Sequence, residues 1–237
     1  MKVLEILSPH RFALRHPPLW IALLALFAIP LLGSSSEVAP VARTPLDLPS
    51  GGSGRSLDEE DAAESILFFG NVYEGDGFFF LLDRSGSMSG LKLGILKAEM
   101  QDALQELSSE SEFGIVAFSG DTSALSPIPL RAQRNNVLQG TVWVNALEAY
   151  GSTMMLGAAQ ELLAIASVCT NDTRSVIVVG DGNPNNPGPA ETLEGIIALN
   201  SEGLPFHTIL IGANESAVEF MMALAAATGG TFRRQTF

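Results

Sequence analysis

Two kinds of hydrophobic pattern alternate along the chain from Ile66 onward. Short, continuous apolar runs are typical of strands covered on both faces, and between them apolar residues recur every three or four positions, as in helices. The runs predict strands at 77–82, 113–118, 175–180 and 206–212, and a short last strand near 230–233. The periodic segments predict helices at 91–107, 131–147, 154–167, 191–199 and 215–228.

This order of elements predicts the fold class. Strands that alternate with helices form parallel βαβ units, and right-handed crossovers place helices on both faces of the sheet. We therefore expect residues 66–237 to form an α/β domain, three-layer and doubly wound, with a mostly parallel central sheet. Residues 66–70 and 73–77 predict an added strand and turn before this core.

The residues before this domain have a different pattern. Residues 19–32 carry no charge and follow a polar leader, residues 1–18. As a helix they would span about 21 Å, less than a hydrocarbon core of about 30 Å. We predict either an uncleaved membrane anchor or a signal segment removed near the small residues 33–36. Residues 33–65 are rich in Pro, Gly and Ser, then acidic, which predicts a tether with a reach of about 30 Å.

Both interpretations of residues 19–32 place the domain outside the cytoplasm, because the positive charges of the leader favour the cytoplasmic side. If the segment is uncleaved, the protein is single-pass in the cell membrane, with the domain on the extracytoplasmic side and the membrane as a partner. If the segment is cleaved, the domain is secreted or periplasmic.

Charge excludes one class of partner. The chain has 13 Lys and Arg against 26 Asp and Glu, and residues 1–36 hold three of the basic and one of the acidic residues. The remainder carries about −15, so nucleic acid is not expected as a partner. The single cysteine, Cys169, cannot form an internal disulfide. It is predicted to be a small buried apolar residue, with pairing between chains as the alternative.

Polar side chains follow the predicted strands where these end. Asp83 follows the first strand in LDRSGSMSG, which also supplies Ser85 and Ser87; Thr153 lies in YGSTMM, and Asp181 follows the third strand. Ligands of open α/β sheets bind beyond the carboxyl ends of the strands. A helix N-cap would use only one of these oxygens. Two carboxylates with several hydroxyls favour a hard cation such as Mg²⁺, with Ca²⁺ and Mn²⁺ as alternatives.

Three segments, FLLDRSGSMSG, GSTMMLGAAQELL and VIVVGDGNPNN, in this order, resemble the von Willebrand factor type A domain with its metal-ion-dependent adhesion site, a Rossmann-like fold. The resemblance covers about residues 66–237. It implies that Ser85 and Ser87 bind a metal directly and that Asp83 and Asp181 act mainly through bound water. Thr153 would bind the metal directly or through water, depending on whether the ligand site is filled. Ser152 replaces a frequent glycine. Gly180 replaces a frequent serine, whose lost hydroxyl puts the metal affinity in question.

The resemblance and the residues together predict a domain that holds an acidic side chain of another protein through the metal. We assign no catalytic residue and expect no enzyme, because neither a general base nor a nucleophile accompanies the cluster. His207 is expected in a strand, as a packing residue, and Arg84 as an exposed, solvated side chain that could steer a partner. A metal-dependent hydrolase using the same cluster, and a structural domain without a metal, are the alternatives.

Overall fold

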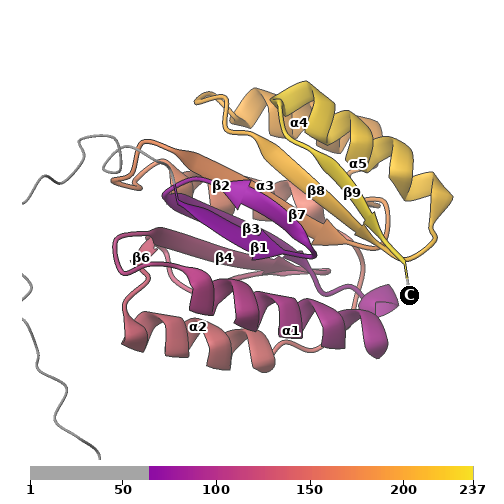
Figure 1. The fold of residues 1–237 in the computed structure, drawn as a ribbon. Helices are drawn as coiled ribbons and strands as arrows, with labels where there is room; N and C mark the ends of the chain where they lie inside the picture. Colours follow the sequence, from indigo (N-terminus) through magenta and orange to yellow (C-terminus); the bar gives the residue numbers. More distant parts are fainter. Residues whose placement is uncertain (1–63, 237) are drawn as a thin grey trace, which may run out of the picture. The chain divides into compact units, whose positions relative to one another are not determined.

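The central sheet of the domain is mostly parallel, as predicted. The computed structural model describes residues 64–236 (Figure 1). Within them the large sheet has seven strands. Its parallel part follows the order β4-β3-β7-β8-β9. These strands are β3 (Gly77–Asp83), β4 (Glu112–Phe118), β7 (Arg174–Gly180), β8 (Phe206–Ile211) and β9 (Phe232–Gln235).

The predicted leader, the hydrophobic segment 19–32 and the tether up to residue 63 lie outside the described residues. Within residues 64–236, no helix combines the length and the apolar character that a membrane crossing requires.

Helices cover both faces of the sheet, which confirms the three layers (Figure 1). One apolar cluster joins one face of the sheet to α1 and α2, and a second joins the opposite face to α3, α4 and α5. Every residue of β3 and β4 is buried, because these strands lie inside the sheet and between the layers. The helices are α1 (Leu91–Glu106), α2 (Arg134–Asn145), α3 (Met155–Ala166), α4 (Pro189–Leu199) and α5 (Glu215–Thr228).

The outer edge of β4 carries two short strands that the hydrophobic pattern did not predict. β5 (Thr122–Ala124) and β6 (Leu130–Arg131) both pair with β4 in the antiparallel direction. Each has too few residues to show an alternating pattern. Pairing of β6 also explains why α2 begins at Arg134, three residues after the predicted start at position 131.

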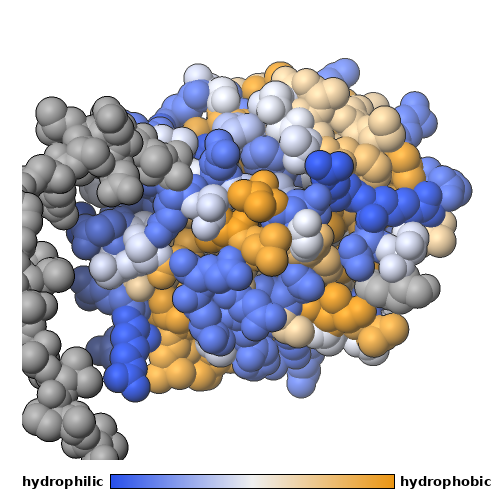
Figure 2. Space-filling model, viewed as in Figure 1, coloured by the Kyte–Doolittle hydropathy of each residue, from blue (hydrophilic) through white to orange (hydrophobic). Residues whose placement is uncertain are grey.

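Before the core lies a hairpin, where we expected one strand and a turn. β1 (Ser65–Phe68) and β2 (Asn71–Glu74) form a separate two-stranded antiparallel sheet. The Phe68 ring packs edge-on against Phe80 of β3, with 5.5 Å between the ring centroids. On the outer face, the cross-strand partners Leu67 and Val72 are exposed, and an apolar patch lies over the hairpin in Figure 2.

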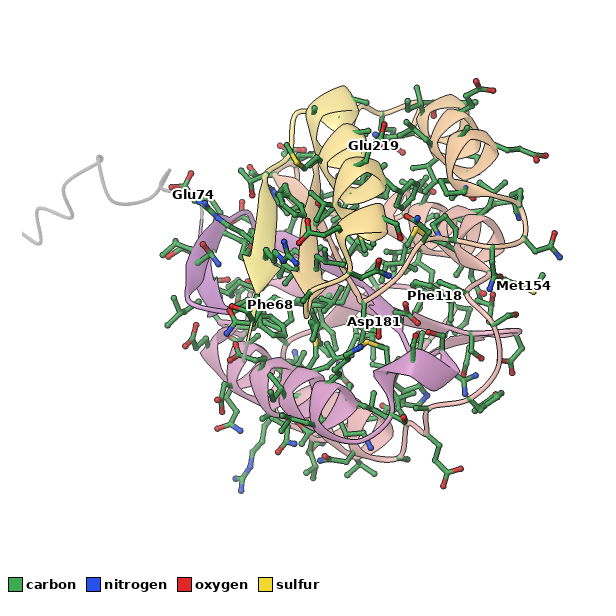
Figure 3. The ribbon with its side chains drawn as sticks, turned by 90° about the vertical axis from the view of Figure 1, so that its right-hand side faces the viewer. Phe68, Glu74, Phe118, Met154, Asp181 and Glu219 are labelled. Atoms are coloured by element: carbon green, nitrogen blue, oxygen red, sulfur yellow. The ribbon has the colours of Figure 1, made fainter. Side chains whose placement is uncertain are left out.

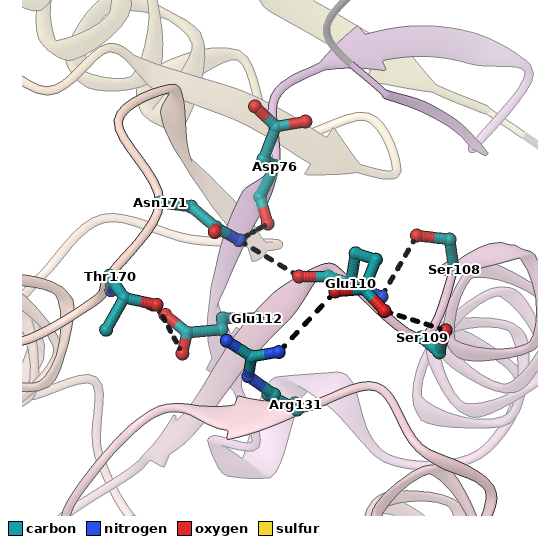
Figure 4. A network of polar contacts seen from close by, with 8 residues as sticks. All are labelled: Asp76, Ser108, Ser109, Glu110, Glu112, Arg131, Thr170 and Asn171. Atoms are coloured by element: carbon teal, nitrogen blue, oxygen red, sulfur yellow. Dashed lines mark hydrogen bonds and ion pairs between the residues drawn. The ribbon is translucent and has the colours of Figure 1, made fainter. Parts of the chain in front are cut away.

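At the amino ends of the strands, a polar network joins the loops (Figure 4). The Glu112 carboxylate accepts hydrogen bonds from the backbone N–H and the hydroxyl of Thr170, at 2.6 and 3.0 Å. The Asn171 amide donates to the Asp76 carbonyl at 2.6 Å. Cys169 lies beside Glu112, and burial raises the pKa of its thiol to about 12. The thiol therefore stays protonated at neutral pH, in a half-buried packing position.

Two glycines follow one another at the end of α5, for two different reasons. Gly229 adopts a left-handed conformation with φ of 76°, which costs glycine little. A Cβ at Gly230 would lie 2.0 Å from the Phe206 carbonyl oxygen, because the chain crosses the start of β8 there. Only a residue without a side chain fits at position 230.

We expect Gly230→Ala to lower the free energy of unfolding by about 3 kcal/mol, since a backbone shift must relieve the clash. Gly157→Ala in α3 is the control, because a Cβ there would meet no atom within 4 Å among the described residues. That variant should be more stable by up to about 1 kcal/mol. Urea unfolding measures both, and equal stability of the two variants would contradict the close approach.

Candidate metal centre

The site begins with Asp83, the last residue of the central strand β3. Its neighbours in the sheet are β4 and β7, so its side chain is fully buried. One carboxylate oxygen, Oδ1, accepts a hydrogen bond from the Ser85 backbone N–H at 2.7 Å. This turn leads into a short 3₁₀ helix, η1 (Gly86–Met88), and then into α1.

Hydrogen bonds connect this turn to the end of β7, the neighbour of β3 in the sheet. The Ser85 and Ser87 hydroxyl oxygens lie 3.1 Å apart, and the Ser87 hydroxyl donates to Asp181 Oδ1 at 2.7 Å. Asp181 directly follows β7, and Figure 3 labels it at the edge of the domain turned toward the viewer. Four of the five predicted residues therefore form one continuous set of contacts.

Thr153 is placed by its backbone. Its N–H donates to Asn185 Oδ1 at 3.2 Å, and its carbonyl accepts the Asn185 N–H at 3.0 Å. Gly151, two residues before Thr153, contacts η1: its carbonyl accepts a hydrogen bond from the Gly86 N–H at 3.1 Å. These bonds tie the Thr153 loop to the loops of Asp83 and Asp181. No hydrogen bond joins the Thr153 hydroxyl to the other four residues, all of which the structure describes.

The electrostatics of the site are dominated by the burial of Asp83. Burial raises the pKa of its carboxyl group from 3.8 to about 6; the hydrogen bonds from Ser85 oppose this shift, and the charge of Asp181 adds to it. The second oxygen, Oδ2, is buried without a hydrogen-bond partner in the described part of the chain. Leaving such an atom unpaired is costly, so the site suits a cation.

The ligand chemistry is limited to oxygen. Among residues 64–236, no three His, Cys, Asp or Glu side chains gather as a metal-binding group. A metal at this edge would therefore depend on the hydroxyls of Ser85, Ser87 and Thr153 as well as on the two carboxylates. Such a set of oxygens fits a hard divalent cation.

Comparison with known proteins decides the family. A sequence model of the von Willebrand factor type A domain matches residues 78–233. The chain belongs to this family. The predicted family and its Rossmann-like fold are thereby confirmed. Type A domains typically serve protein–protein interaction or adhesion, and related proteins are generally not enzymes.

The curated relatives are much longer than this type A domain. A von Willebrand factor A domain-containing protein of Dictyostelium discoideum is 27% identical over 128 residues, which are 53% of this chain and 6% of the relative. Inter-alpha-trypsin inhibitor heavy chain H3 of Homo sapiens is 26% identical over 168 residues, 65% of this chain and 18% of the relative. The chain thus spans less than a fifth of either relative.

Solved structures share the fold of the type A domain. A von Willebrand factor type A protein from Catenulispora acidiphila has a TM-score of 0.60 and 19% identity, covering 76% of this chain and 48% of that one. The corresponding domain of the type V pili tip protein Mfa5 from Porphyromonas gingivalis has a TM-score of 0.53 and 11% identity. The match covers 68% of this chain and 89% of that one.

Gly180 has a steric role that the sequence did not show. A Cβ at this position would lie 3.0 Å from Asp83 Oδ2 and 3.1 Å from Asp83 Cβ. A serine at position 180 would therefore press on the buried carboxylate. In this type A domain, the glycine makes room for Asp83, in addition to lacking a supporting hydroxyl.

The expectation of an exposed, solvated Arg84 was wrong. Arg84 is 7% exposed, its Nη2 lies 2.8 Å from Asp121 Oδ1, and its guanidinium carbon lies 4.4 Å from the centre of the Tyr150 ring. The Tyr150 hydroxyl also donates to Asp121, at 2.8 Å. Arg84 thus ties three loops together. No sequence pattern indicated this pairing, because Asp121 is 37 residues away from Arg84 and resembles an ordinary turn residue.

The raised pKa of Asp83 predicts how stability depends on pH when metal is removed by EDTA. The folded state holds this proton more tightly than the unfolded chain does. The resulting stability is fully present below about pH 4 and is lost as the pH rises to about 6, where ionised Asp83 costs up to about 3 kcal/mol. Asp83→Asn removes this cost and should be about 1–3 kcal/mol more stable than the wild type at pH 7.5.

Urea unfolding in EDTA between pH 4 and 7.5 measures this difference, which should shrink toward pH 4. Asp102→Asn, on the exposed surface of α1, is the matched control and should follow the wild type. A less stable Asp83→Asn at pH 7.5 would show that the ionised carboxylate does not destabilise the fold.

Proposed function

We propose that this type A domain binds a divalent cation through Asp83, Ser85, Ser87, Thr153 and Asp181, and uses it to hold an acidic side chain of another protein. The observation that carries the proposal is the buried Asp83 Oδ2, which has no partner within the described residues and lies at the edge where Asp181 and the hydroxyl residues meet. When bound, the cation would supply a Lewis-acidic position for the partner's carboxylate.

The side chains of this domain set the charge that the cation meets. Asp83 and Asp181 together match the charge of a divalent ion, while the serine and threonine hydroxyls add neutral oxygens. Ser87 and the neighbouring Gly86 are exposed, whereas Asp83 is buried, so a partner would approach over η1. Because the chain is strongly acidic, an acidic partner is repelled at long range, and the cation provides the local attraction.

The choice of ion follows from the ligands. Oxygen-only ligands favour Mg²⁺, with Ca²⁺ and Mn²⁺ as alternatives. The structure of proximal thread matrix protein 1 of the mussel byssus has zinc in its metal-ion-dependent adhesion site (MIDAS) motif. Its TM-score is 0.50 and its identity 16%, over 68% of this chain and 41% of that one. Zinc therefore joins the ions to be tested.

We propose binding without chemical turnover. His207, the histidine within the described residues, lies in β8 at the amino ends of the strands and packs edge-on against Tyr73, with 5.0 Å between the ring centroids. His207 thus lies near the amino ends of the parallel strands, whereas Asp83 lies at their carboxyl ends. This placement supports a packing role and favours a binding function over a hydrolase.

Calorimetric titration of the purified full-length chain with MgCl₂, MnCl₂, CaCl₂ and ZnCl₂ tests the metal. Asp83→Ala, and Ser85→Ala combined with Ser87→Ala, should each weaken Mg²⁺ binding by at least about 100-fold, because ligands are lost. Asp102→Ala should bind like the wild type. The same heats from all variants, or none from the wild type, would refute the site.

Crosslinking in cells then tests the partner. The crosslinked product should vanish on chelation and in Asp83→Ala, and should persist in Asp102→Ala. A product that survives both the chelator and the serine double variant would favour the structural alternative.

We further propose that residues 19–32 carry the domain across a membrane and, if uncleaved, hold it there. The uncharged segment, the basic leader before it and the tether after it support this proposal. A tag at the carboxyl end should be digested by protease added to cells whose outer membrane, where present, has been opened and whose cytoplasmic membrane is intact, or should be found in the medium; deletion of residues 19–32 should leave it protected inside the cell. A wild-type tag that is digested only after the cytoplasmic membrane is broken would contradict export.

A further inference from the structure

Lys92 reaches the candidate metal centre from the first turn of α1, and the sequence pattern did not single it out. Its ammonium group forms an ion pair with Asp181 Oδ2 and donates to the Ser87 carbonyl at 3.3 Å. The end of its aliphatic stem passes Gly212, where a Cβ would lie 3.5 Å from Lys92 Cε. The side chain of Lys92 is 34% exposed, whereas that of Asp181 is 1% exposed.

Both oxygens of Asp181 are therefore engaged, one by the Ser87 hydroxyl and one by the Lys92 ammonium. A lysine at a helix N-terminus faces the positive end of the helix dipole, so α1 alone does not favour it there. The buried carboxylate of Asp181 explains its position, because a buried charge needs a counter-ion. Lys92 thus acts as the positive charge that balances Asp181.

We propose that Lys92 is an internal cation that competes with the divalent metal for Asp181 and so sets the metal affinity. The inference rests on the proposed function. With Lys92 in place, the two carboxylates and the ammonium leave one net negative charge, too little to match a divalent ion. A divalent ion must then either displace the ammonium group from Asp181 or bind beside a positive charge. Each of these costs free energy and lowers the affinity for the ion. The partly exposed Lys92 side chain can move out into solvent.

The competition predicts opposite effects of one substitution. Lys92→Met removes the charge and keeps an aliphatic stem. It should bind Mg²⁺ about tenfold more tightly, because the repulsion disappears, and in EDTA its melting temperature should fall by about 2–4 °C, because Asp181 loses its counter-ion. Lys92→Arg should resemble the wild type in both measurements.

Lys97→Met is the matched control, since Lys97 lies on the same helix and donates to the Asn145 carbonyl at 2.9 Å instead of to the site. It makes the same change in net charge and should leave the Mg²⁺ affinity unchanged. Lys92→Gln, which keeps a hydrogen-bond donor, repeats the test in case Lys92→Met does not fold.

Calorimetry with MgCl₂ on the full-length chain, together with thermal unfolding in EDTA, distinguishes the outcomes. Tighter binding with lower stability in EDTA supports the competition. A Lys92→Met variant that binds Mg²⁺ like the wild type, or more weakly, overturns it and leaves the metal site standing. If the wild type binds neither Mg²⁺ nor Mn²⁺, the proposed function fails and this inference fails with it.

Discussion

The buried charge of Asp83 is the constraint on which the site depends. The carboxylate ends the central strand, with a neighbouring strand on each side, and burial raises its pKa to about 6. Ser85 satisfies one oxygen, and the other has no hydrogen-bond partner within residues 64–236. The fold therefore keeps a group that it does not fully satisfy, as proteins often do where binding requires it.

The surrounding loops are built to hold that arrangement. Gly180 leaves space against Asp83, because any Cβ there would lie 3.0 Å from the carboxylate. Arg84 joins the site turn to Asp121 and Tyr150, while Asn185 pins the backbone of Thr153. These side-chain contacts thus hold the loops in position without a ligand. A rigid frame of this kind lowers the entropic cost of binding.

The proposed role of Lys92 links the stability of the fold to the affinity for a divalent ion. Lys92 offsets the charge of Asp181 in the fold. In the mechanism we propose, the same ammonium group would oppose a divalent ion at this carboxylate. A domain of this kind would hold its shape without tight metal binding. Its affinity for the ion could then change through one side chain on α1, without altering the ligands themselves.

Local patterns in the sequence were sufficient for the parallel strands, the helices and the family. Continuous apolar runs predicted β3, β4, β7 and β8, and the motifs around Asp83, Thr153 and Asp181 predicted the edge of the sheet where they meet. Gly229 ends α5 through its own left-handed backbone conformation, which is a local effect, whereas the need for glycine at position 230 comes from the distant Phe206 carbonyl.

Contacts between distant residues were decided only by the tertiary structure. The pairing of β5 and β6 with β4, the burial of Arg84 against Asp121, and the ion pair of Lys92 with Asp181 each join segments far apart in the chain. Arg84 and Lys92 look like ordinary surface residues by type and spacing. Their roles come from which carboxylate the fold brings beside them, because the effect of a charge depends on its burial and its neighbours.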